Sequence, residues 1–216
     1  MAWVYEQLDF LSALTANLYM YEGADVTEPR FIEEHPRDVL GTITEVTFAD
    51  GIMDAMLRGL SSPKFLRSNR EQLGIDPSRL NSIEPPNVID QIDAAVRETL
   101  GSKWSEEVAS KFGVRQLLAT ALEHYPSSYH GFSNKVAAVF SALNSVGFWP
   151  DKGKDEAAIS GFNDSLHAAS AAYTDVLVSN DKRMRIKSAA AYELFGVDTL
   201  VLDSDAFLSH FVAQSA

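Results

Sequence analysis

Two aspartates near the C-terminal end of the chain have the side-chain type and the setting for metal-dependent chemistry. Asp181 follows a short apolar run, Val-Leu-Val at 176–178, through a Ser-Asn turn. We expect that run to be a buried strand, and binding crevices in open α/β sheets lie at the carboxyl ends of strands. Asp164 opens the preceding predicted helix, near the same edge if that helix runs antiparallel to the strand. Paired carboxylates suit Mg²⁺ or Mn²⁺, which can activate a water for attack on a phosphate ester.

Polar and basic side chains around these acids suggest contacts to a substrate. Ser179 and Asn180 could orient a ligand or a metal-bound water. His167 lies three residues after Asp164, on the same helix face, and could contact a phosphate or a metal-bound water. A local basic patch beside an acidic centre suits a phosphodiester; its members are Lys182, Arg183, Arg185 and Lys187.

Each of these features also has a simpler interpretation. Asp164 and Asp181 both stand just before predicted helices, where an aspartate caps free backbone N–H groups. The basic run is equally typical of a solvated helix face, and His167 of a core or supporting histidine.

The elements that must position these residues alternate between helix and strand. Such alternation predicts a parallel sheet covered by helices. The predicted elements are a helix over 164–173, a strand over 176–178, a helix over 182–195 stopped by Gly196, a strand over 197–202 and a helix over 204–212 with Ser204 as N-cap.

The preceding part of the chain is mostly helical in pattern. We expect a single α/β domain over 1–216, with a helical section over 64–150 inserted into it or packed on it. Other predicted elements are an amphipathic helix over 3–21, a loop or short helix to 38, a strand within 39–48 and a helix to 60. Within the helical section, helices are expected over 87–100 with Gly101 as cap, over 104–125 with a break near Gly113, and over 133–146 with Ser133 as N-cap.

Composition excludes several classes of protein. The net charge is −12, so general binding of polyanions is not expected. The chain has no cysteine, which excludes disulfides and thiolate metal sites. No apolar run is long enough to span a bilayer and no secretory signal opens the chain. We therefore predict a cytoplasmic protein without membrane contacts.

The C-terminal pattern resembles the C-terminal half of a PIN domain. The matching stretch runs from Asp164-x-x-His167 through Asp175-Val-Leu-Val-Ser-Asn-Asp181 to Val197-x-Thr-x-Val-Leu202, about 50 residues. PIN domains are α/β folds with acidic metal sites, and many are Mg²⁺- or Mn²⁺-dependent ribonucleases. The resemblance implies that Asp164 and Asp181 are metal ligands and that Ser179-Asn180 is the family's polar turn.

The N-terminal part departs from that family. PIN domains open with a strand ending on a metal-binding Asp, and only Asp9 is available early in this chain, within a helical pattern. The family's second acid, a Glu, has its counterpart in Asp50, with Glu45 as a second choice.

These observations leave three functions open. The first is a metal-dependent ribonuclease with Asp164, Asp181 and Asp50 as catalytic acids, Asp9 as a further metal ligand, and RNA as partner. The second is a catalytically inactive PIN-like module that binds a protein partner or another copy of itself. The third is a metal-dependent phosphatase acting on a small molecule.

Overall fold

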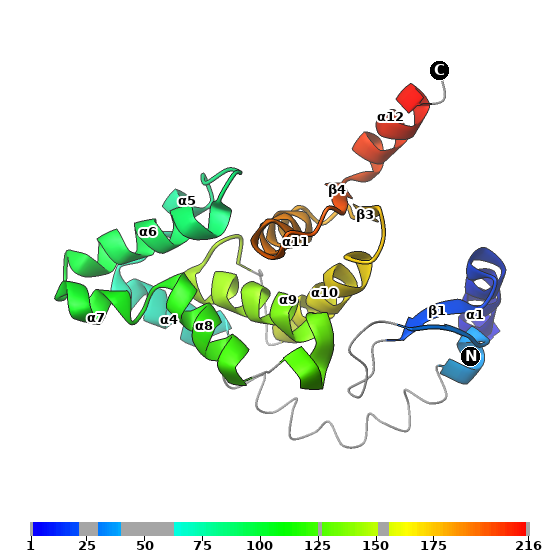
Figure 1. Cartoon of the computed structure of the whole chain (residues 1–216), viewed down its shortest axis with the longest axis horizontal. Helices are drawn as coiled ribbons and strands as arrows, with labels where there is room; N and C mark the ends of the chain where they lie inside the picture. The colour runs from blue at the N-terminus through cyan, green and yellow to red at the C-terminus, as the bar shows by residue number, and fades with distance from the viewer. Residues whose placement is uncertain (1, 22–29, 40–62, 125–126, 151–155, 215–216) are drawn as a thin grey trace.

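The computed structural model describes residues 2–21, 30–39, 63–124, 127–150 and 156–214 (Figure 1). These residues form a mostly helical structure with two small sheets. They fall into two regions: the N-terminal unit, residues 2–21 and 30–39, and the main body, the described residues from 63 onwards. No helix in the described ranges is long and apolar enough to cross a membrane.

The first part of the main body is entirely helical, as predicted for 64–150. The break expected near Gly113 separates α7 from α8. A Cβ at this position would lie 2.5 Å from Asp93 Oδ1, so glycine allows the close approach to α6. The helices are α4 (Pro63–Leu73), α5 (Pro77–Leu80), α6 (Val88–Gly101), α7 (Glu106–Ser110), α8 (Val114–His124) and α9 (Ser127–Val146).

The second part alternates helix and strand. Its elements are α10 (Glu156–Ala171), β3 (Val176–Val178), α11 (Lys182–Phe195), β4 (Leu200–Leu202) and α12 (Ser204–Gln214). β3 and β4 pair in parallel, with Val176 opposite Leu200 and Val178 opposite Leu202. The predicted α/β pattern is therefore present. The parallel sheet has two strands among the described residues, fewer than the larger sheet expected of a PIN-like fold.

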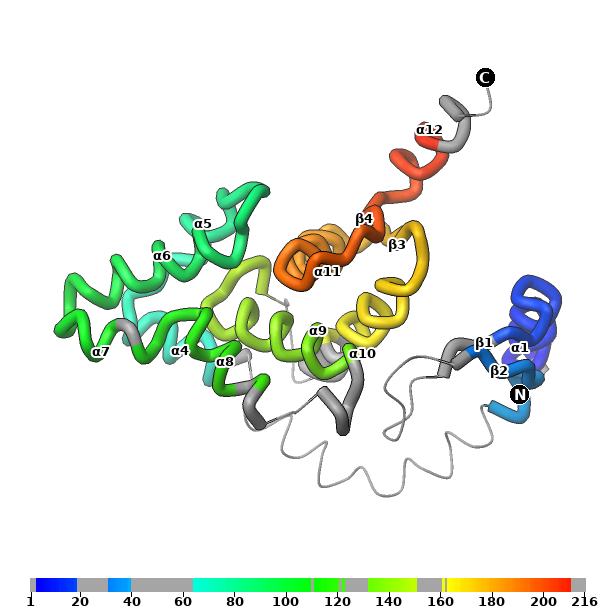
Figure 2. The backbone as a smooth tube through the Cα atoms, viewed as in Figure 1, coloured from blue at the N-terminus to red at the C-terminus, as the bar shows by residue number. Residues whose placement is uncertain are grey.

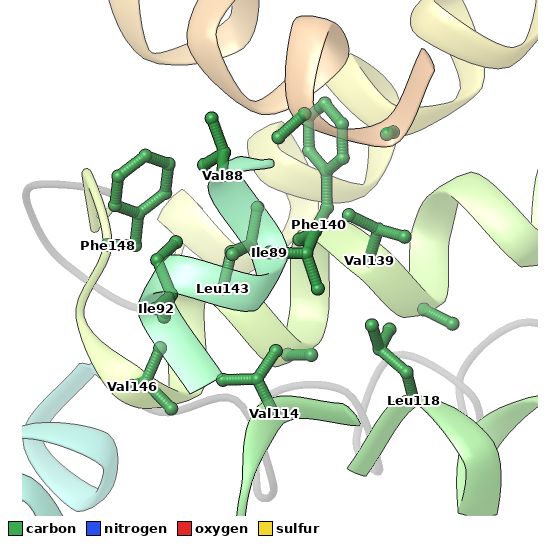
Figure 3. Close-up of a cluster of buried hydrophobic side chains, with 14 of the residues drawn as sticks. Val88, Ile89, Ile92, Val114, Leu118, Val139, Phe140, Leu143, Val146 and Phe148 are labelled. Carbon is green, nitrogen blue, oxygen red and sulfur yellow. The ribbon is translucent and has the colours of Figure 1, made fainter. Parts of the chain in front are cut away.

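The hydrophobic core lies around α9, which contacts α4, α8, α10 and α11. Figure 3 shows Val139, Phe140 and Leu143 of α9 among side chains from α6 and α8. Phe148, in the turn after α9, is completely buried. α9 is apolar over much of its surface because neighbouring helices cover several of its faces.

Two buried or bridging carboxylates join elements of the main body. Asp93 of α6 accepts a hydrogen bond from the backbone N–H of Arg115 (2.9 Å) and pairs with Arg97 Nε (2.8 Å). Glu193 of α11 accepts from the backbone N–H groups of Asn87 and Val88, the latter at 3.1 Å. A carboxylate at the start of α6 satisfies free donors and complements the helix dipole. It also links α11 to the helical part.

The N-terminal unit consists of α1 (Ala2–Thr15), an antiparallel hairpin of β1 (Leu18–Tyr21) and β2 (Arg30–Glu33), and a helical turn at 36–39. Figures 1 and 2 show it set apart from the main body. The helix predicted over 3–21 is therefore too long. Ala16 and Asn17 adopt positive φ angles of 50° and 63°, and this left-handed pair reverses the chain. β2 was not predicted.

Several predicted caps are also wrong. Gly101 lies inside α6, whose C-cap is Ser102. α9 begins at Ser127, so Ser133 is an interior residue. α12 begins at Ser204, and its first turn is capped by Asp203, which accepts from Ala206 N at 2.9 Å. Gly196, by contrast, ends α11 as predicted, with φ 66° in the left-handed region.

Candidate functional site

The carboxyl ends of β3 and β4 form the edge at which the sequence predicts a site. Because the strands are parallel, both ends lie on the same side of the sheet. The ladder extends one residue further, since Ser179 N donates to Leu202 O at 3.0 Å. Each strand then enters a helix through a short polar turn, so the N-terminal ends of α11 and α12 meet at this edge. We refer to Ser179, Asn180, Asp181, Arg185 and Asp203 as the strand-end cluster.

Asp181 acts as the N-cap of α11. Its Oδ1 accepts hydrogen bonds from Arg183 N (2.7 Å) and Met184 N (3.2 Å). Its own backbone N–H donates to Ser179 Oγ (3.2 Å). This confirms the interpretation of Asp181 as a helix cap. A cap does not by itself exclude a second role for the carboxylate.

Asp203 is the residue of this edge that sequence reasoning missed. It caps α12, and its Oδ2 lies 3.3 Å from Arg185 Nη2. The signal was present in the sequence, because Asp203 follows the apolar strand Leu200–Leu202 much as Asp181 follows β3. Asn180 joins the two turns, since its Oδ1 accepts from Ser204 N at 3.2 Å.

Arg185 lies between the two strand ends. Its Nη1 donates to the carbonyl oxygen of Ser179 (2.7 Å), while its Nη2 faces Asp203. The guanidinium thus bridges the turn after β3 and the turn after β4. Its side chain is only 21% exposed, half the value for Asp203 (41%). The cation therefore neutralises part of the negative charge that a metal site would need.

The predicted basic patch is divided among structural contacts. Lys187 is buried, with its Nζ hydrogen-bonded to Asn144 Oδ1 and 5.7 Å from the Phe140 ring centre. Lys182 Nζ lies 4.4 Å from the centre of the Trp149 ring. Arg183 is half-buried. The interpretation of the run as one solvated helix face is wrong for Lys187, because α11 is covered by α9 and α10.

Asp164 does not open its helix. α10 begins at Glu156, so Asp164 is an interior residue and the capping interpretation is wrong there. Its helix is tied to α11 further along, where the Tyr192 hydroxyl donates to the carbonyl oxygen of Ala168. Burial raises the pKa of Tyr192 to about 12. His167 is exposed on α10.

Asp9, the early acid that the structure describes, does not lie at the strand-end cluster. Asp9 lies on α1 in the N-terminal unit, where both carboxylate oxygens are 2.6 Å from Arg37 Nη2. Arg37 also lies over the Tyr5 ring, 4.8 Å from its centre. Asp9 therefore fastens α1 to the segment after β2. Asp50 and Glu45 lie outside the described residues.

The described donors do not form a complete metal site. Within the described ranges, no group of three or more His, Asp or Glu side chains could hold a metal ion. The strand-end cluster supplies Asp181 and Asp203, and both accept backbone hydrogen bonds while Asp203 also faces Arg185. At this edge, hydrogen bonds and an ion pair connect the turn after β3 to the turn after β4.

Comparison with known proteins adds no family to this picture. No protein-family model, curated protein or solved structure matches the chain. The PIN domain accordingly remains a resemblance, carried by Asp164, by Ser179-Asn180-Asp181 and by the β3–α11–β4 order.

Proposed function

We propose that this chain is a protein-interaction module whose PIN-like α/β part is a structural support and not a nuclease centre. The observation that carries this proposal is the position of Arg185. A metal-dependent phosphodiesterase needs several carboxylates facing an open, cation-binding space. Here a guanidinium bridges the two strand ends at which such a space would form.

The contacts of the basic side chains on α11 support the same proposal. An RNA-binding groove needs lysines and arginines that can reach phosphates. Lys187 is buried and Arg185 is engaged with Asp203 and Ser179, which leaves exposed Lys182, over the Trp149 ring, and half-buried Arg183. The net charge of −12 opposes any further attraction to a polyanion.

The N-terminal unit supplies a positive reason for interaction with a protein. Several of its largest apolar side chains are exposed, among them Trp3, Phe10, Leu14, Leu18 and Phe31. Exposed apolar surface gathered in one region is typical of a binding surface. Interaction is therefore the function that uses the exposed side chains of this unit.

Calorimetric titration with Mn²⁺ tests the proposal. We expect no saturable binding to the wild-type chain at millimolar Mn²⁺, and no Mn²⁺-dependent cleavage of RNA. The contrary result is saturable binding that Asp181→Asn abolishes and Asp175→Asn preserves. Asp175 is an exposed aspartate at the opposite end of β3, so it controls for a general loss of negative charge.

A metal-dependent ribonuclease is the second candidate, and one observation favours it. Asp181 and Asp203 stand at the carboxyl ends of adjacent parallel strands, which is where α/β sheets bind ligands. In this case Arg185→Ala should increase Mn²⁺ affinity, because it removes a competing cation. An unchanged titration in Arg185→Ala would count against the nuclease.

A further inference from the structure

The apolar side chains of α1 are not spread evenly around the helix. Trp3, Phe10 and Leu14 are separated by seven and four residues, a spacing that places them on one helix face. They are 70%, 62% and 69% exposed. Val4 and Leu11 flank them with lower exposure. We call these five residues the α1 stripe.

The side of α1 that lies away from Trp3, Phe10 and Leu14 makes the contacts within the unit, and Val4 and Leu11 border it. Leu8, Ser12 and Thr15 are half-buried. Ser12 Oγ donates to Asn17 Oδ1 (2.6 Å), and the Asn17 carbonyl accepts from Glu34 N (2.9 Å). The helix is thus fastened by the side that carries Leu8 and Ser12, and its three most exposed apolar side chains face solvent on the other side. This is the reverse of the usual orientation of an amphipathic helix on a domain.

The spacing of the stripe is suited to a second helix. Val4, Leu11 and Leu14, together with polar Gln7, follow the alternating three- and four-residue steps of a coiled-coil seam, over 11 residues. Trp3 and Phe10 flank that seam one heptad apart. Apolar residues in such a pattern accept the apolar face of an amphipathic helix.

The negative charge around the α1 stripe indicates which kind of helix could bind there. Residues 1–39 contain eight acidic and two basic residues, a net charge of −6. Exposed Glu6 lies next to the stripe, three residues after Trp3 and four before Phe10. A second copy of this chain would bring the same negative charge to the contact. An anionic bilayer surface would be repelled for the same reason.

We propose that the α1 stripe binds an amphipathic helix of a partner protein that has an apolar face and basic flanks. The proposal rests on the proposed function and names the chemistry of the partner. Apolar burial along the seam would supply most of the affinity, and opposite charge would select the partner.

Fluorescence anisotropy with two synthetic peptides tests this pairing on the full chain. The first is a labelled helix of about 18 residues, roughly five turns, with leucine at three- and four-residue spacing and lysine elsewhere. The second has glutamate in place of every lysine. We expect the Leu/Lys peptide to bind at least about tenfold more tightly than the Leu/Glu peptide. Equal binding of both would overturn the charge argument, and no binding would overturn the site.

Variants in and outside the α1 stripe distinguish specific binding at the stripe from nonspecific hydrophobic binding and from effects on folding. Phe10→Glu should lower the affinity for the Leu/Lys peptide about tenfold although it adds negative charge, whereas Phe65→Glu should leave that affinity unchanged. Phe65 is a matched control because it is 51% exposed on α4, in the main body. Glu6→Lys should lower the affinity for the Leu/Lys peptide and raise the affinity for the Leu/Glu peptide. Equal losses in Phe10→Glu and Phe65→Glu would overturn the assignment.

The other occupants give distinct results. A dimer in light scattering that Phe10→Glu disperses would assign the stripe to a second copy. Binding to anionic phospholipid vesicles that Phe10→Glu abolishes would assign it to a membrane surface. Either result overturns the proposal. Asp181-dependent Mn²⁺ binding would overturn the proposed function alone, since the peptide measurement does not involve the strand-end cluster.

Discussion

The main body buries most of its large apolar side chains, whereas the N-terminal unit exposes several of its own. In the main body, α9 is surrounded by other helices, and side chains such as Val136, Leu143 and Phe148 are completely buried. In the N-terminal unit, Pro36 alone is buried among the side chains that the structure describes there. One region has a core, and the other presents its largest apolar groups to solvent.

Polar groups follow the same division. In the main body, buried Asp93, Lys187 and Thr199 have hydrogen-bond partners, as buried polar groups require. In the N-terminal unit, the Arg37–Asp9 pair is about half exposed on both sides. A two-stranded hairpin with one helix is marginal without further burial. The contrast indicates that the main body is stable by its own packing, while the N-terminal unit has little packing of its own; the partner proposed above would add to its stability.

Replacing one buried and one exposed phenylalanine is the strongest test of this contrast. Phe148→Ala should lower the free energy of unfolding by about 4 kcal/mol, because it removes apolar contacts and leaves a cavity. Phe31→Ala should change it by less than about 0.5 kcal/mol. Urea unfolding followed by circular dichroism measures both. Similar values for the two variants would contradict the division into a packed and an unpacked region.

Asp93 tests whether the main body depends on its buried polar contacts. Asp93→Ala should cost about 2 kcal/mol, because the backbone N–H of Arg115 loses its acceptor in a partly buried place. Asp90→Ala is the control, since Asp90 pairs with the side chain of the same Arg115 but is exposed. We expect little change in that variant. A loss in Asp90→Ala as large as in Asp93→Ala would show that burial is not the cause.

Asp181 tests the role of the strand-end cluster. Asp181→Ala should cost about 1 kcal/mol by loss of the N-cap, and Asp181→Asn only a few tenths, because asparagine also caps helices. Chemical denaturation of the two variants measures this difference. If the main role of Asp181 were metal binding, both variants would lose metal affinity to the same extent. Asp181→Ala would then be no less stable than Asp181→Asn.

Tyr192 gives the smallest effect, one that appears only at high pH. Its pKa is raised from its ordinary value to about 12 by burial. The stabilisation from the neutral hydroxyl is complete below the ordinary pKa of tyrosine, and it decreases as the pH rises toward 12. Between about pH 9 and 11, roughly one unit on either side of that ordinary pKa, the urea midpoint of Tyr192→Phe should therefore decrease less than that of the wild type. Identical pH profiles would contradict the burial of this group.

The sequence predicted best those elements that are determined by local interactions. The range 182–195 for α11 was correct because Asp181 caps its start and Gly196 ends it, and both effects act within one helical turn. The range of β3 was correct because three apolar residues lie between polar turns, but only Leu177 of the three is buried. The N-terminal hairpin was missed because the residues after Thr15 continue an apolar helical spacing, while two left-handed residues end the helix.

The candidate site was predicted in part. Ser179, Asn180 and Asp181 do lie at a strand end beside a second parallel strand. The expectation that Asp164 opens its helix was wrong, because α10 starts eight residues earlier than expected, at Glu156. Arg185 was expected only as part of the basic patch, and Asp203 was not connected to the site at all, because the contact between them depends on the pairing of β3 with β4 across 24 residues of sequence.

By itself, the sequence determined the helical character of the chain, the β–α–β order near its end, its acidity and the cap at Asp181. These properties follow from composition and from interactions between residues a few positions apart. The tertiary structure decided that Arg185 bridges the two strand ends, that Lys187 is buried, and that the apolar face of α1 faces outward. Each of these depends on which surfaces meet, and that is a property of the packed chain as a whole.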